Sequence, residues 1–451
     1  MNVDCRRWRF LAVPTAMLLW AALPAARAQG AADTAPLERR LEQSIRMIES
    51  LAARVDQLER ELAAARRAGA PASAAASSPV PVAAAPAAAP ASADRVAELE
   101  KTVSQLTAST GRDLRDPGLP LHGFADVGWS QRRGAPPGAR GGFAVGSLDF
   151  YLTPEFGANV KTLVELNVGV EGSGETSIDL ERAQIGYSFS DRLTVWLGRF
   201  HTPFGYWNMA FHHGAQIQPS VARPRLLDFE DDGGILPVHT TGLWATGGFR
   251  DGTGKLTYHL YTGNGTRIVN GSLDPNPAGD DNANKVVGGA LGYRFGGRLD
   301  GLAVGAHALR QVVDAYDAGG ALLGKTRLGL VSAHAVYDDD GWEIIGEAYR
   351  TATVDLSGSA GRHAGRLGYL HVGRSFDDRW MPYLRWERAV LDATDTYFAL
   401  LGNGHTYTRQ VLGMRYNADP RAAIKLEFNR TNDQGLGHAL DEWRLQYAVG
   451  F

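Results

Sequence analysis

The chain has almost no cysteine: Cys5 is the only one among its 451 residues. A disulfide within the chain is therefore excluded, and the many turns suggested by its 54 glycines must be held by backbone pairing. Cys5 also precedes the apolar run of a secretion signal, so the exported chain should contain no cysteine.

The sequence also lacks long hydrophobic runs. Beyond the N-terminal signal, no uninterrupted run reaches the roughly 18 apolar residues that a membrane-spanning helix needs. If the mature chain enters a bilayer, it must do so as a closed β-barrel, in which every backbone polar group has a partner.

Residues 1–28 have the features of a secretory signal peptide. Arg6, Arg7 and Arg9 precede apolar residues 10–23, and Ala26-Arg27-Ala28 fits a cleavage pattern. Cleavage removes four arginines and one aspartate from totals of 46 basic and 49 acidic residues, which leaves a net charge of −6. An acidic chain of this kind is not expected to bind nucleic acid.

Heptad spacing predicts a coiled coil over residues 36–68. Its core positions are Leu37, Leu41, Ile48, Leu51, Val55, Leu58 and Leu62, with Ser44 as a polar break. The wide apolar stripe suits three helices, although one amphipathic helix packed on the barrel remains an alternative. An Ala/Pro-rich linker follows over residues 69–93, and a second short coiled coil over residues 94–110.

From residue 119 to residue 451 the sequence changes to short alternating segments separated by turn residues. The clearest is the C-terminal strand, in which apolar residues alternate with Arg444, Gln446, Ala448 and Gly450. The apolar positions are Trp443, Leu445, Tyr447, Val449 and Phe451. One face of such a strand suits lipid and the other water, which predicts an all-β transmembrane barrel. A soluble β-sandwich also alternates and is the rival fold.

About sixteen antiparallel strands can be counted, with the fifth near residues 193–200 and the sixth near residues 241–249. Between them lies the longest stretch without strand features, residues 201–240. A loop of this length in an ordered domain is usually functional, and here it could narrow the pore. The alternative is a solvated surface loop.

The loop carries both signs of charge, which would give a constriction a transverse field. The candidate constriction residues are Arg223, Arg225, Asp228, Glu230, Asp231 and Asp232. By alternation, the candidate lumen residues on the wall are Lys161, Glu165, Arg182, Arg385, Glu387, Arg415, Lys425 and Glu427.

Residues 180–187, LERAQIGY, and residues 197–205, LGRFHTPFG, resemble the phosphate-selective porin family. The layout from Leu37 to Phe451 is similar to related trimeric porins with a periplasmic N-terminal coiled coil. The resemblance implies a sixteen-stranded homotrimeric channel in the outer membrane of a Gram-negative cell, with an inward-folded third loop. It also implies contact with outer-membrane lipid and recognition of the C-terminal strand by the barrel-assembly machinery.

The expected function is passive diffusion of small hydrophilic solutes, with a preference for small organic or inorganic anions. Lysine is sparse in the barrel, so phosphate specificity is not expected. Two alternatives stay open: a tether in which the coiled coil contacts the cell wall, and an outer-membrane hydrolase, although no G-x-S-x-G motif occurs. No cofactor or metal is expected, because His212 and His213 are adjacent in a loop and are predicted to be surface histidines.

Overall fold

The computed structural model describes residues 121–135, 141–170, 174–230, 232–276 and 279–451. The predicted signal peptide, both coiled-coil segments, the linker and Asp231 lie outside these residues. Among the described residues no helix is long and apolar enough to cross a membrane, and that finding has no bearing on crossing by strands.

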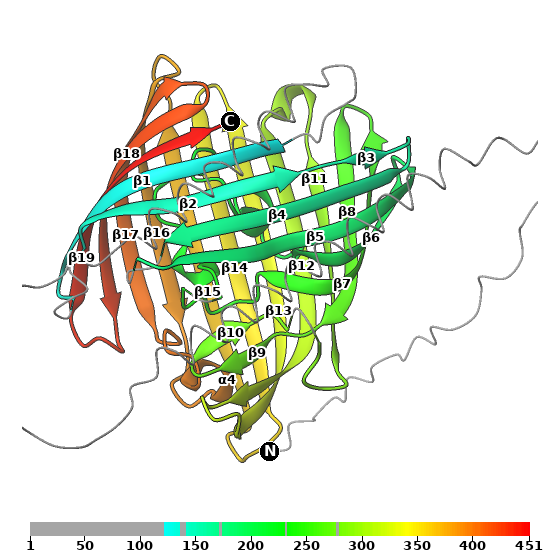
Figure 1. Ribbon diagram of the computed structural model, residues 1–451, viewed down its shortest axis with the longest axis vertical. Coiled ribbons are helices and arrows are strands. Elements are labelled where there is room, and N and C mark those ends of the chain that lie inside the picture. The colour runs from blue at the N-terminus through cyan, green and yellow to red at the C-terminus, as the bar shows by residue number, and fades with distance from the viewer. Residues whose placement is uncertain (1–120, 136–140, 171–173, 231, 277–278) are drawn as a thin grey trace, which may run out of the picture. The chain divides into compact units, whose positions relative to one another are not determined.

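Sixteen long antiparallel strands form one sheet that closes on itself, with β19 paired to β1 (Figure 1). The strands are β1 (Leu121–Arg133), β2 (Phe143–Leu152), β4 (Val160–Val170), β5 (Thr176–Ser190), β6 (Leu193–His201), β7 (His239–Asp251), β8 (Gly254–Asn264), β11 (Lys285–Arg294), β12 (Leu302–Tyr316), β13 (Leu322–Asp339), β14 (Trp342–Asp355), β15 (Arg362–Arg374), β16 (Trp380–Val390), β17 (Tyr407–Asp419), β18 (Ala422–Asp433) and β19 (Ala439–Gly450). The predicted number of strands and the predicted fifth and sixth strands are confirmed. A two-sheet sandwich is wrong, because each long strand pairs with both neighbours around one closed sheet.

Short elements accompany the barrel. They are β3 (Glu155–Phe156), β9 (Arg267–Val269), β10 (Ser272–Asp274), α3 (Tyr206–Ala210), α4 (Thr396–Ala399) and the 3-10 turns η1 (Arg225–Leu227) and η2 (Gly297–Leu299). Strand β9 pairs in parallel with the end of β12 and antiparallel with β10.

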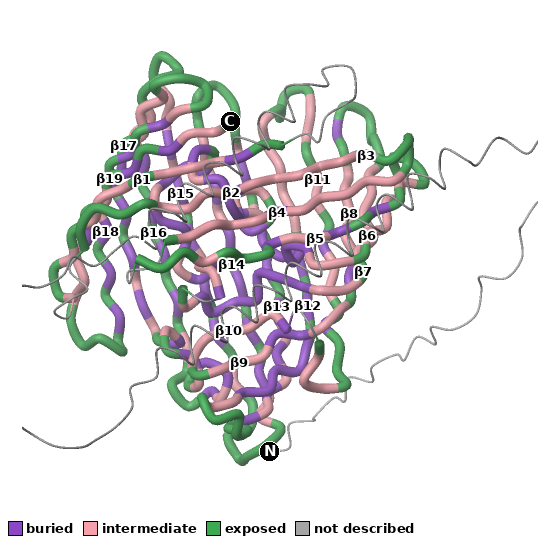
Figure 2. The backbone as a smooth tube through the Cα atoms, in the orientation of Figure 1, coloured by how far each residue is buried: buried purple, intermediate pink, exposed green. Residues whose placement is uncertain are grey.

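Side chains alternate between the two faces of the wall, and buried and exposed positions alternate most regularly in β14, β15, β16 and β18 (Figure 2). In β19, Trp443, Leu445 and Tyr447 are exposed on the outside, whereas Glu442 and Gln446 are buried inside. The outer surface is therefore apolar and the interior polar, as expected for a strand between lipid and water.

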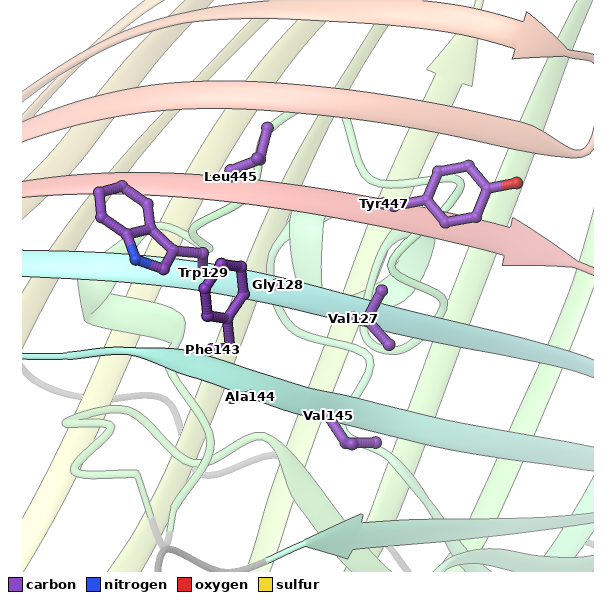
Figure 3. Close-up of a pocket in the computed structure, with 8 residues that line it drawn as sticks. All are labelled: Val127, Gly128, Trp129, Phe143, Ala144, Val145, Leu445 and Tyr447. Atoms are coloured by element: carbon purple, nitrogen blue, oxygen red, sulfur yellow. The ribbon is translucent and has the colours of Figure 1, made fainter.

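An apolar hollow marks the outer surface where the barrel closes. Residues from β19, β1 and β2 line it: Val127, Gly128, Trp129, Phe143, Ala144, Val145, Leu445 and Tyr447 (Figure 3). Phe143 is 90% exposed there. An exposed apolar surface of this kind suits contact with lipid or with another protein.

The chain end completes the closure of the wall. Gly123 and Phe451 exchange two backbone hydrogen bonds, each of 3.0 Å, and the Phe451 ring meets the Phe150 ring edge-on. A side chain at position 123 would collide with this ring, because a Cβ atom there would lie 2.3 Å from Phe451 Cζ.

A β-bulge interrupts the alternation where β4 and β5 pair. Glu165 lies opposite Arg182, but the next residue, Leu166, lies opposite Leu180, so Glu181 has no partner in β4. Leu180 is exposed on the outer surface, whereas Glu181 is buried inside. The extra residue therefore turns two consecutive charged side chains, Glu181 and Arg182, to the interior.

Candidate pore constriction

The loop between β6 and β7, residues 202–238, is folded into the barrel. Its backbone is hydrogen-bonded to side chains of wall strands that are far apart in sequence, including β2, β14, β16 and β18. Most of the loop residues are buried. The alternative of a solvated surface loop is therefore wrong for this segment.

Glu347 of β14 holds the beginning of the loop. Its carboxylate accepts the backbone N–H groups of Tyr206 at 2.6 Å and Trp207 at 2.9 Å. The hydroxyls of Tyr349 and Tyr369 also donate to it, at 2.8 and 2.5 Å. Two donors therefore satisfy each oxygen of this buried carboxylate.

A second anchor holds the middle of the loop. Glu427 of β18 accepts the backbone N–H groups of Val221 at 2.9 Å and Ala222 at 3.1 Å. Arg385 of β16 donates to Ser220 Oγ at 2.5 Å and to the Ala222 carbonyl at 2.9 Å. The wall thus binds both the donors and the acceptors of one stretch of loop backbone.

A third contact lies next to the second. Glu387 accepts the backbone N–H of Arg225 at 2.8 Å and Arg385 Nε at 2.8 Å. Lys425 donates to the Ala215 carbonyl, and the Arg225 guanidinium pairs with Asp433. These wall residues face the interior and are covered by the loop, with Arg385, Glu387, Lys425 and Glu427 at most 2% exposed.

Beside the loop lies a polar cavity of about 420 Å³, bounded by the loop and by β1, β2, β4, β5 and β19. The charged residues that line it are Asp126, Asp149, Asp179, Glu181, Asp228, Asp232, Arg223 and Arg444, together with His213. Six carboxylates thus face two arginines among the described lining residues. A confined site with low-dielectric walls strengthens the effect of such fixed charges on passing ions.

The charged loop residues predicted to form the constriction differ in where their side chains lie. Arg223 and Glu230 are buried: the Arg223 guanidinium lies 4.0 Å from the Phe229 ring centre, and Glu230 accepts the backbone N–H of Val238 at 3.0 Å. They stabilise the loop, although Arg223 also borders the cavity with Asp228 and Asp232. Burial raises the pKa of Asp228 to about 6, although the nearby arginines, Arg409 and Arg223, favour its charged form.

The remaining predicted wall residues lie at three places. Glu165 pairs with Arg182 across β4 and β5. Arg415 of β17 donates to the Gln218 carbonyl of the loop at 2.9 Å. Lys161 lies in β4, four residues before Glu165 and on the same face by alternation.

Sequence reasoning missed several interior residues. Strict alternation assigns Glu181 to the lipid face, and only its position beside a second charged residue, Arg182, hinted at a bulge. Glu347 was missed because nothing in its strand marks it as the partner of a loop some 140 residues away. The prediction that His212 and His213 are surface histidines is wrong: they are 2% and 8% exposed, because the loop folds inward.

No protein-family model matches the chain, and no curated protein matches its sequence. Among solved structures, the anion-selective porin from Comamonas acidovorans is 14% identical, with 74% of this chain and 99% of that chain covered and a TM-score of 0.52. The outer membrane protein OmpT of Vibrio cholerae, in its trimer form, is 11% identical, with the same coverage and a TM-score of 0.50. At such identities the likeness concerns the fold alone. By its architecture, the described part of the chain is a closed sixteen-stranded antiparallel β-barrel with the fold of bacterial outer-membrane porins.

Proposed function

We propose that this chain is an outer-membrane porin, a passive diffusion channel for small hydrophilic solutes. The observation that carries the proposal is the loop of residues 202–238, which is pinned inside the barrel and leaves a charged cavity of about 420 Å³ beside it. A barrel of sixteen strands is too wide for wall side chains alone to fill. The inward loop is therefore proposed to form the constriction.

The lining favours cations over the anions expected from the sequence. Six carboxylates line the cavity and outnumber its two arginines; they are Asp126, Asp149, Asp179, Glu181, Asp228 and Asp232. The Comamonas acidovorans porin is described as anion-selective, but its likeness to this chain is one of fold. We therefore propose a preference for small cations, with phosphate and dicarboxylates disfavoured.

The assembly is proposed to be a homotrimer embedded in outer-membrane lipid. The exposed apolar surface around Phe143, Val145 and Leu445 supports a lipid or protomer contact, and the Vibrio cholerae protein has a trimer form. The role of the strand ending at Phe451 in recognition by the barrel-assembly machinery stays a prediction, as do the coiled coil and its contact with the cell wall.

Conductance in a planar bilayer tests the channel directly. The full chain should give discrete openings, and its reversal potential in a KCl gradient should have the sign of cation preference. Absence of discrete openings would contradict the channel and favour the tether, in which the barrel only anchors the chain. Discrete openings with an anion preference, strengthened by phosphate or a dicarboxylate, would overturn the proposed cation selectivity but leave the channel function in place.

A further inference from the structure

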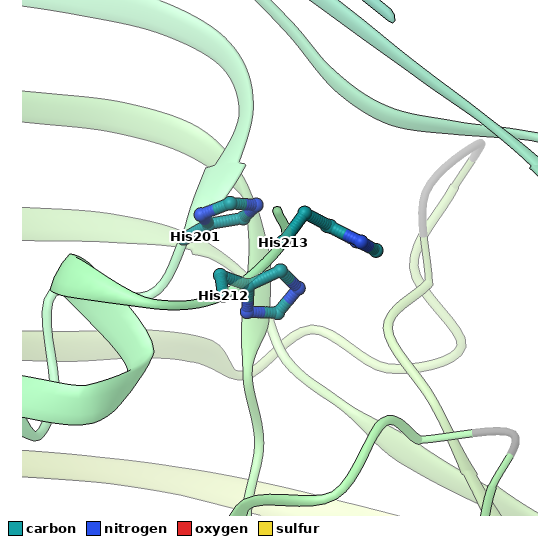
Figure 4. Close-up of side chains that lie close together, drawn as sticks. All are labelled: His201, His212 and His213. Atoms are coloured by element: carbon teal, nitrogen blue, oxygen red, sulfur yellow. The ribbon is translucent and has the colours of Figure 1, made fainter. Parts of the chain in front are cut away.

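Four of the chain's twelve histidines meet at the base of the loop. His201 is the last residue of β6 and His239 the first residue of β7, while His212 and His213 come from the loop. Figure 4 shows the ring of His201 facing His212, with His213 beside them. Glu181, which the bulge in β5 turns inward, approaches the same group.

The atoms that could bind a metal ion are close together. One nitrogen each from His212 and His239 and one oxygen of Glu181 all lie within 4.8 Å of one another, and the same limit holds for His201, His212 and His213. His239 Nε2 lies 2.9 Å from Glu181 Oε2, and His213 Nε2 lies 3.4 Å from it. When two donor atoms bind one transition-metal ion with bonds of about 2 Å, the donor atoms lie about 3 Å from each other.

These atoms are buried and have few partners among the described residues. Nε2 of His212 has no hydrogen-bond partner among them. Nε2 of His239 and Nε2 of His213 both approach the one oxygen Glu181 Oε2, and Nε2 of His201 lies 3.4 Å from Glu165 Oε2. Buried polar atoms are nearly always satisfied, so the bare Nε2 of His212, next to a carboxylate oxygen that several imidazoles crowd, points to a missing partner. A cation at this place would bind Nε2 of His212, a nitrogen of His239 and the Glu181 carboxylate together.

The Nδ1 atoms of two of the rings already have oxygen partners. His212 Nδ1 is 2.7 Å from Asn208 Oδ1, and His239 Nδ1 is 2.8 Å from Glu230 Oε2. An oxygen acceptor at Nδ1 fixes the proton there and leaves the Nε2 lone pair free to bind. Metal-binding histidines almost always have such a second contact to a carboxylate, an amide or a carbonyl.

We propose that His212, His239 and Glu181 form a binding site for a divalent transition-metal ion of the zinc class. Two imidazoles and one carboxylate match the ligand sets that zinc accepts, and His201 or His213 can supply a fourth ligand. The site joins β5, β7 and the loop, so a bound ion holds the loop to the wall at a place distinct from Glu347 and Glu427. The proposal does not depend on the channel function, because it concerns binding alone.

Zinc binding to the full chain tests the site. The protein is purified in detergent without a polyhistidine tag, stripped with a chelator and titrated with Zn²⁺ by calorimetry, while Co²⁺ is followed by its visible absorption. We expect one Zn²⁺ per chain and Co²⁺ bands typical of nitrogen and oxygen ligands. His212→Ala and His239→Ala should each weaken binding by about 10-fold or more, and Glu230→Gln by about 10- to 100-fold.

His405→Ala is the matched control, because His405 is an exposed histidine that also lies near a carboxylate, 3.7 Å from Asp433. It should leave zinc affinity unchanged. Equal binding by wild type and the folded double variant His212→Ala/His239→Ala would overturn the proposal. The proposal would also be overturned if wild-type protein did not change the visible absorption of Co²⁺. This measurement needs no variant, and its negative result would mean that the histidines and Glu181 form only hydrogen bonds and ion pairs.

Discussion

The Glu427 carboxylate of β18 accepts the backbone N–H of Val221 at 2.9 Å, a bond between the barrel wall and the middle of the inward loop. The same carboxylate also binds the N–H of Ala222, so its loss would remove two of the bonds that hold this stretch of loop backbone to the wall.

Replacing this anchor should loosen the constriction. In Glu427→Ala, the loop N–H groups lose their acceptor, at a cost of about 1–3 kcal/mol for each buried group left unpaired. We expect higher and noisier single-channel conductance and a lower unfolding temperature. Asp300→Ala, in an exposed turn, is the control and should change neither. Wild-type conductance and noise in folded Glu427→Ala would show that the loop does not depend on this anchor.

Neutralising exposed cavity carboxylates should weaken cation preference. Asp179 and Asp232 line the cavity and are both exposed. One unit charge about 10 Å from a permeating ion contributes about 0.4 kcal/mol in water, or roughly a twofold effect on its local concentration. The same charge lowers the local anion concentration by the same factor, so Asp179→Asn and Asp232→Asn should each lower the cation-to-anion permeability ratio about fourfold, as measured from reversal potentials. Asp300→Asn removes the same charge outside the cavity and should have no effect; an equal effect there would point to net charge instead of the lining.

Selectivity should also depend on pH near neutrality. Because burial raises the pKa of Asp228 to about 6, this carboxyl is charged at pH 7.5 and mostly neutral at pH 5, whereas an ordinary aspartate is charged at both. Cation preference should therefore fall as pH falls from 7.5 to 5. Reversal potentials of Asp228→Asn should change less over this interval. A pH dependence of the same size in that variant would assign the titration to another group.

The contact between Gly123 and Phe451 can be tested with a pair of glycines. In Gly123→Ala the new Cβ would lie 2.3 Å from the Phe451 ring and 2.7 Å from the Asp149 carbonyl, so the chain end or the wall must shift. We expect a loss of about 1–3 kcal/mol in the free energy of unfolding. In Gly142→Ala the Cβ would meet nothing within 4 Å, and stability should hardly change. Equal unfolding midpoints in urea for the two variants would refute this account of the closure.

The parts of the barrel that follow alternation could be predicted from the sequence. Trp443, Leu445 and Tyr447 are exposed outside, as their spacing from Arg444 and Gln446 indicated, because a strand has only two faces. Alternation fails at Glu181, since one inserted residue at a bulge reverses the faces beyond it.

The loop contacts could not be predicted. His212 and His213 are neighbours in sequence, but His201 and His239 reach them only because the loop turns into the barrel between two paired strands. The pairing of Glu427 with Val221 spans 206 residues and depends on how the whole barrel closes. A single sequence carries no local pattern for contacts of this kind.

The loop is anchored mainly through its main chain, and this has an evolutionary consequence. Glu347, Glu387 and Glu427 bind backbone N–H groups, which every residue type except proline provides. Side chains along the loop can therefore change while its path is kept. Substitutions within the loop could therefore change which solutes pass, while the barrel wall stays the same.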